Sequence, residues 1–153
     1  TKTVESTVAL NAINSLAFLP TPNKLLLILN GSLYELNDGL QMVYDGVEDG
    51  YWDDDAERVV FYSKNEILIY NTEELVTTLV HRSLSPLATP VMNDYTGYFF
   101  FSNEGKIKAI EIDGRNHRNV YTITDGAKNF TLSRDGKFLY AVTNKELTVF
   151  KIR

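Results

Sequence analysis

Acidic residues surround the only tryptophan of the chain, in the stretch DGYWDDDAE at residues 49–57. Carboxylates in one loop can bind a divalent cation, as in calcium loops, or contact a polar ligand. However, Asp53, Asp54 and Asp55 are consecutive, no glycine follows them, and no glutamate lies at the calcium-loop spacing. The pattern therefore favours a turn between two strands, and we predict no metal site.

The aromatic residues beside these carboxylates are better candidates for recognition. Tyr51 and Trp52 are neighbours, so in a regular strand their side chains point to opposite faces. A ring that is exposed on one of these faces could stack on a ligand or a peptide. We therefore predict weak ligand or partner contacts at Tyr51, Trp52, Asp49 and Asp53, although a tryptophan at such a position is more often part of a core.

Catalytic chemistry has little support in the sequence. The chain has no cysteine, no G-x-S-x-G elbow, no P-loop and no dinucleotide-binding glycine pattern. The two histidines, His81 and His117, are far apart and lie outside any metal-ligand spacing, so we expect solvated loop histidines. We predict no catalytic residue and no cofactor.

The composition of the chain disfavours several classes of partner. The net charge is −5 and no basic stripe is visible, which disfavours nucleic acid and anionic membrane surfaces as partners. No apolar run approaches the roughly 20 residues that a membrane helix requires, so we expect no membrane insertion by this segment. The absence of cysteine fits a reducing compartment or a bacterial envelope protein that avoids thiols, and we slightly favour the envelope or an extracellular location over the cytoplasm.

The elements that position these residues come from an internal repeat. Apolar runs begin at Leu25, Val59, Tyr98 and Phe138, which are 34, 39 and 40 residues apart. A tight turn with an asparagine follows each run, and the Asn30–Gly31 pair is a strong signal for a type I′ hairpin. A further strand follows each turn, and helical periodicity is weak throughout the chain. The ambiguous window 71–80 favours a strand from about Val76.

Four short strands in a period of about 40 residues are typical of a β-propeller blade. The segment LSRDGKFLY at 132–140 resembles the turn of TolB-like, YVTN-like and WD40-like propellers, with Ala56 and Tyr95 at the positions that match Gly136. The resemblance implies an all-β chain, one propeller unit over residues 1–153, built from four four-stranded blades. We expect the blades at about 15–47, 50–82, 87–124 and 128–153.

The last expected blade ends after its third strand, and residues 3–10 form a spare strand before the first blade. Propellers commonly close when an N-terminal strand completes the last blade, which removes a bare sheet edge. We therefore expect natural ends of a ring-forming unit, although the start at Thr1 resembles a domain cut from a longer protein. The residues predicted for the shared strand pairing are Val4, Ser6, Val8, Leu10, Leu147, Val149 and Ile152.

Two ring geometries remain open. One chain could form a four-bladed ring, which crowds the inner strands, or two chains could form an eight-bladed ring with two identical seams. We favour the homodimer, in which residues 3–10 of one copy complete the last blade of the other. The sequence predicts a non-catalytic module for protein or ligand recognition and assembly; the alternatives are a single-chain four-bladed propeller or a hydrolase-like or lactonase-like propeller enzyme with a central-channel site.

Overall fold

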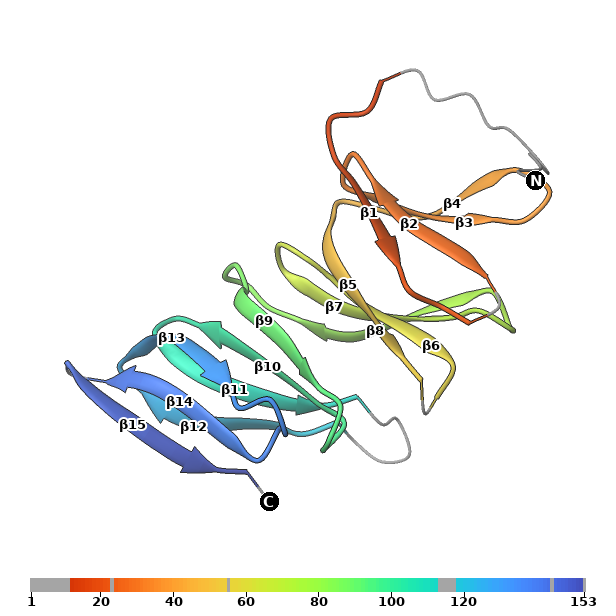
Figure 1. Cartoon of the computed structure of the whole chain (residues 1–153). Helices are drawn as coiled ribbons and strands as arrows, with labels where there is room; N and C mark the ends of the chain where they lie inside the picture. The colour runs from red at the N-terminus through yellow and green to blue at the C-terminus, as the bar shows by residue number, and fades with distance from the viewer. Residues whose placement is uncertain (1–11, 23, 55, 113–117, 144, 153) are drawn as a thin grey trace, which may run out of the picture. The chain divides into compact units, whose positions relative to one another are not determined.

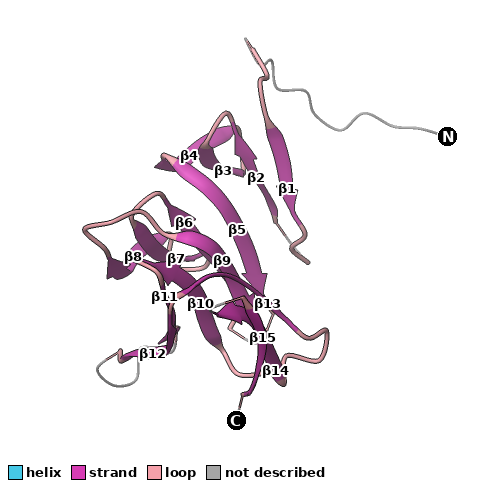
Figure 2. Ribbon diagram, turned by 90° about the vertical axis from the view of Figure 1, so that its left-hand side faces the viewer, coloured by secondary structure: helices cyan, strands magenta, loops and turns pink. Residues whose placement is uncertain are grey.

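A computed structural model describes residues 12–22, 24–54, 56–112, 118–143 and 145–152 of the chain. All regular secondary structure in this part is β-strand, with 15 strands in four antiparallel sheets and no helix (Figure 2). Within these residues there is accordingly no apolar helix long enough to span a bilayer. The expectation of an all-β chain is confirmed.

The strands follow one another in chain order, and each sheet uses consecutive strands (Figure 1). The first sheet contains β1 (Leu16–Leu19), β2 (Leu25–Leu29), β3 (Ser32–Leu36) and β4 (Leu40–Asp45). The second contains β5 (Val47–Asp53), β6 (Arg58–Ser63), β7 (Glu66–Asn71) and β8 (Val76–Arg82). The third contains β9 (Ala88–Asn93), β10 (Tyr98–Asn103), β11 (Lys106–Glu111) and β12 (Val120–Asp125). The fourth contains β13 (Ala127–Leu132), β14 (Phe138–Thr143) and β15 (Glu146–Lys151).

The apolar runs expected to begin at Leu25, Val59, Tyr98 and Phe138 lie in β2, β6, β10 and β14. The first strand of the second sheet begins at Val47, ahead of the expected start near Gly50. A bulge between Val47 and Asp49 extends the pairing of β5 with β6 in this direction. The strand expected from about Val76 is confirmed as β8.

The hairpin between β2 and β3 is determined by local backbone conformation. Asn30 and Gly31 have φ values of 52° and 80°, as a two-residue type I′ turn requires. The turn between β10 and β11 has the same pattern at Glu104 and Gly105, with φ values of 53° and 72°. Asn103, which we expected in that turn, lies instead at the end of β10.

The turns between the first and second strands differ from the expected alignment. Gly136 has a φ of 69° in the fourth sheet. In the second and third sheets the left-handed residues are Glu57 and Gly97, with φ values of 47° and 69°, rather than Ala56 and Tyr95. The left-handed position has moved toward the second strand, so the missing glycines at Ala56 and Tyr95 impose no backbone strain there.

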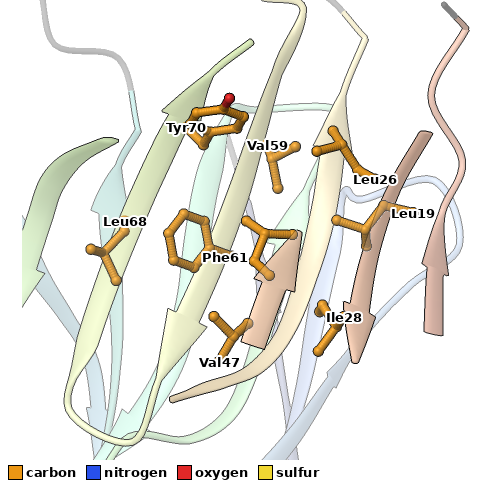
Figure 3. Packing of buried hydrophobic residues seen from close by; sticks show 9 residues of the cluster. Leu19, Leu26, Ile28, Val47, Val59, Phe61, Leu68 and Tyr70 are labelled. Carbon is orange, nitrogen blue, oxygen red and sulfur yellow. The ribbon is translucent and has the colours of Figure 1, made fainter. Parts of the chain in front are cut away.

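The chain divides into two compact units, Thr1–Ser63 with Leu68–Thr78 and Lys64–Ile67 with Leu79–Arg153. In the first unit, apolar side chains from the first two sheets form one core (Figure 3). Its members alternate along their strands, as expected for sheets that bury one common face. The buried residues of this core are Leu19, Leu26, Ile28, Leu33, Val47, Val59, Phe61, Leu68 and Tyr70.

The buried carboxylate of Glu35 and the ammonium group of Lys24 lie at the end of the first core beside the β1–β2 turn. Glu35 on β3 is 1% exposed, and its carboxylate accepts a hydrogen bond from the hydroxyl of Tyr70 on β7. The ammonium group of Lys24 lies 3.0 Å from the same carboxylate and also donates to the backbone carbonyl of Thr72. Burial and the bond to Glu35 raise the pKa of Tyr70, so this hydroxyl stays protonated as the donor.

The second unit has its own core, between the third and fourth sheets. It contains the buried side chains of Phe100, Ile107, Ala109, Ala127, Leu139 and Ala141. Beside the β13–β14 turn this core is closed by uncharged groups. The side-chain amide of Asn93 donates to the backbone carbonyl of Gly136 at 2.9 Å and accepts from the Tyr95 amide at 3.1 Å.

Candidate functional site

Three of the four predicted contact residues lie on one face of β5. The register pairs Asp49 with Tyr62, Tyr51 with Val60 and Trp52 with Val59. Because side chains alternate along a strand, Asp49, Tyr51 and Asp53 share a face and Trp52 points to the other. The structure therefore separates the two aromatic rings, as the sequence predicted.

Trp52 packs against the first core. Its ring is partly buried against this core, which includes its strand partner Val59. The indole Nε1 atom is buried and has no hydrogen-bond partner among the described residues. Packing is therefore the observed role of this ring.

Asp53 holds the turn that follows β5. Its Oδ2 atom lies 2.9 Å from the Nε atom of Arg58, and its Oδ1 atom accepts a hydrogen bond from the Ala56 amide at 3.3 Å. Asp54 is exposed, and Asp55 lies outside the described residues. An aspartate suits this position because its side chain can cap backbone amides of a turn. These contacts are structural, while the predicted ligand contact at Asp53 stays a prediction.

Asp49, Tyr51 and Tyr62 form a polar group on the remaining face of β5 and β6. Burial raises the pKa of Tyr51, and the charge of Asp49 raises it further. The pKa of Tyr62 is raised by burial first and then by Tyr51, Asp49 and Glu48. Both phenols are protonated at neutral pH, so they can donate hydrogen bonds but cannot act as bases.

Tyr62 was not predicted as part of this site. It lies directly opposite Asp49, so residue pairing across the β5–β6 hairpin brings it there. Alternation within the apolar run RVVFYS places Tyr62 on the same face as Val60. Its partner on β5 depends on the bulge after Val47. The sequence alone does not specify that register.

The predicted shared edge can be examined at its C-terminal half. β15 is the last strand of a sheet whose order is β13-β14-β15. Leu147 and Val149 are 70% and 52% exposed, whereas Ile152 follows the strand and packs partly against the second core. Val4, Ser6, Val8 and Leu10 lie outside the described residues.

His81 does not have the environment that we expected. It lies in β8 and its ring centroid is 5.4 Å from that of Phe101, so the expectation of a solvated loop residue is wrong. Burial, followed by the charge of Lys108, lowers the pKa of His81. His117 lies outside the described residues. In the part of the chain that the structure describes, no three His, Asp or Glu side chains are grouped as metal ligands.

The loop after β8 is braced by asparagine side chains. Asn103 is 4% exposed, and its amide donates to the Ser83 hydroxyl at 3.0 Å and to the Ser85 carbonyl at 3.0 Å. Asn65 donates to the Ser83 carbonyl at 3.1 Å. This loop, at residues 83–87, is therefore held by defined contacts although it is the longest connection between neighbouring sheets.

Comparisons with known proteins show the fold. No family model and no curated protein matches the sequence. Among solved structures, a chain in a complex of S. cerevisiae Dbp5 with Nup159 and Gle1 is 12% identical with a TM-score of 0.64, covering 91% of this chain and 38% of that one. A 6-phosphogluconolactonase-like protein from Bacteroides uniformis is 9% identical with a TM-score of 0.58, covering 89% and 50%.

An auxiliary nutrient binding protein from Bacteroides thetaiotaomicron is also similar, at 17% identity and a TM-score of 0.57, covering 91% of this chain and 41% of that one. This chain therefore spans half or less of the length of each of these three proteins. The neighbours include propeller-type folds, which agrees with the repeated antiparallel sheets. The fold is propeller-like, and the three similar proteins differ in what they do, so the likeness does not select a function.

Proposed function

We propose that this chain is a non-catalytic propeller module that assembles with a second copy of itself. In this proposal, residues 3–10 of one copy pair with β15 of the other and supply the fourth strand of its last sheet. The observation that carries the proposal is the strand count: among the described residues, three sheets have four strands and the last has three.

The exposed side chains of β15 support this proposal. An edge strand presents unpaired backbone groups, and proteins usually protect such edges with charge, proline or a covering segment. β15 has two exposed apolar side chains, Leu147 and Val149, in a six-residue strand. A further strand would satisfy the backbone groups, and residues 3–10 have alternating apolar positions at Val4 and Val8 that suit a strand with one buried face.

Molar mass in solution tests this assembly. Light scattering coupled to size exclusion should give twice the 17.4 kDa of one chain. A version without residues 1–11 should lose this dimer, whereas substitution of Thr7 by Val should retain it because strand pairing depends on the backbone. A wild-type mass near 17.4 kDa, or a truncated chain that remains a well-folded dimer, would contradict strand exchange.

The second candidate is a hydrolase-like or lactonase-like propeller enzyme with a central-channel site. The group of Asp49, Tyr51 and Tyr62 favours it, because one carboxylate and two protonated phenols could bind a polar substrate. Hydrolysis of glucono-δ-lactone, measured as the release of acid, is a direct test. We expect no rate above the uncatalysed one, whereas turnover that Asp49→Asn abolishes would favour the enzyme.

A further inference from the structure

The first sheet has an apolar face outside the core of its unit. Leu26 and Ile28 point into that core, so the alternate residues of β2 point to the opposite face. The register places Phe18 of β1 opposite Leu27, and Met42 of β4 on the same face through Tyr34. Phe18 and Met42 are 61% and 62% exposed. We call this surface, with Leu16 and Leu25, the leading face.

The fourth sheet has the same asymmetry. Leu139 and Ala141 of β14 point into the second core, and the alternate residues point away from it. Val142 pairs with Leu147, and these side chains are 55% and 70% exposed. Val149 shares their face and is 52% exposed. We call this surface, with Tyr140, the trailing face.

The second strands of the second and third sheets are covered on both faces, although the edge strands β8 and β12 expose Val76, Leu79, Val120 and Tyr121. In β10, the consecutive residues Phe99, Phe100 and Phe101 are at most 2% exposed, so both faces of this strand are covered. In β6, Val59, Val60 and Phe61 are fully buried. Apolar residues on both faces are thus a feature of all four sheets. On the leading face, Leu27 and Leu29 of β2 are 6% and 7% exposed, and the exposed apolar side chains are Leu25 together with Leu16, Phe18 and Met42 on the edge strands. On the trailing face, Val142 of β14 is exposed together with Leu147 and Val149 of β15.

The segments that carry the two faces differ in charge. Residues 12–46, which contain the first sheet, have one lysine against three acidic residues and a net charge of −2. Residues 127–153, which contain the fourth sheet, have six lysines and arginines against two acidic residues and a net charge of +4. Lys151 lies on the trailing face beside the exposed apolar residues, and Asp45 lies on the leading face. Opposite charges around two apolar surfaces favour their pairing with each other over pairing of like with like.

We infer that the leading face and the trailing face are the two halves of one interface between copies of this chain. The first sheet of one copy packs on the fourth sheet of the other, which is a head-to-tail contact. Two copies that close on each other contain this contact twice, once at each seam. This inference rests on the proposed assembly and adds which surfaces meet.

Mixing of two variants tests the inference, because a head-to-tail contact predicts complementation. The leading-face variant carries Phe18→Ser and Met42→Ser, and the trailing-face variant carries Leu147→Ser and Val149→Ser. All four side chains are more than half exposed, so each chain should fold, which circular dichroism verifies. Each variant alone has one damaged surface at both seams and should have a mass near 17.4 kDa. An equimolar mixture has one seam with two intact surfaces and should recover a dimer.

Three outcomes would contradict the inference. If one variant alone remains dimeric, the copies pair like with like or through other surfaces. If both dissociate and the mixture does not associate, the two faces are not partners of each other. A wild-type monomer would overturn the inference together with the proposed assembly. If the face variants behave as expected but removal of residues 1–11 has no effect, strand exchange fails and the face contact stands.

A charge variant provides a second measurement. Lys145→Glu with Lys151→Glu lowers the net charge of residues 127–153 from +4 to 0 while leaving every apolar side chain in place. The dissociation constant should rise on the order of tenfold at low salt and approach the wild-type value above about 0.5 M salt, because salt screens exposed charges. No change at low salt would contradict the electrostatic part of the inference.

Discussion

The two units close the corresponding ends of their cores in different ways. In the first unit, Lys24 beside the β1–β2 turn contacts the buried carboxylate of Glu35, which also accepts from Tyr70. In the second unit, the β13–β14 turn contacts Asn93 through a backbone carbonyl, with no charge involved. Similar sheets thus accept either a buried ion pair or an amide at the same kind of position. The repeat therefore specifies sheets and turns, while each pair of sheets has its own polar contacts.

The loss of folding stability on disruption of these contacts should differ between the two units. A buried charge that loses its partner is costly, whereas replacement of a whole buried pair by apolar side chains can be neutral. A close backbone contact fails instead when a side chain enters the space it occupies. The following predictions test this comparison, in order of decreasing effect.

The largest effect is expected from Lys24→Met. It leaves the Glu35 carboxylate, whose side chain is 2% exposed, without its cation. The free energy of unfolding should fall by about 3 kcal/mol in urea denaturation. The triple variant Lys24→Met, Glu35→Leu, Tyr70→Phe removes the three polar side chains, leaving only the Thr72 carbonyl without its donor, and should recover most of this loss. If the triple variant is no more stable than the single one, the loss came from packing, and the ionic account of the first unit is wrong.

Gly136→Ala tests the contact in the second unit. A Cβ atom there would lie 2.5 Å from the Asn93 Oδ1 atom and 2.8 Å from the Tyr95 Cβ atom, at a φ of +69°. We expect a loss of about 2 to 3 kcal/mol in unfolding free energy. Gly97→Ala is a matched control, because its φ is also +69° but its Cβ would meet nothing within 4 Å. Equal losses in the two variants would show that backbone conformation alone explains the effect.

The smallest effect is a pH dependence of stability that arises from His81 in the second unit. The folded-state pKa of His81 is lowered, by burial first and then by Lys108, from its ordinary value of 6.5. Below pH 6.5 the unfolded chain therefore binds a proton that the folded chain does not, and stability falls as pH falls. Denaturation curves between pH 7 and about pH 5 should show a decline that is smaller in His81→Gln. An unchanged decline would show that His81 is not the group responsible.

Much of the fold follows from local sequence. The asparagine and glycine at 30–31 predict a type I′ turn because few residues adopt positive φ at two successive positions, and both have it. The period of the apolar runs predicts the strands because β-branched and aromatic residues favour an extended, half-buried backbone. The structure places strands at all four runs, β2, β6, β10 and β14.

Less of the candidate site follows from local sequence. Tyr51 and Trp52 point to opposite faces, which follows from the geometry of any strand. The partner of Asp49 depends on a bulge, and the burial of His81 depends on a side chain 20 residues away in another strand. Neither contact can be predicted from the local sequence.

The β-strands, the repeat, the hairpin turns and the unequal charge of residues 12–46 and 127–153 can be predicted from the sequence, because these features depend on neighbouring residues or on composition. Which apolar faces are covered depends on the tertiary structure, since the sequence of a strand with two apolar faces is the same whether or not a sheet packs on it. Val60 and Val142 illustrate this point: both are valines in second strands, and their exposed fractions are 0% and 55%. The free energy of burial depends on contact with another surface, which is a property of the folded arrangement and not of the residue.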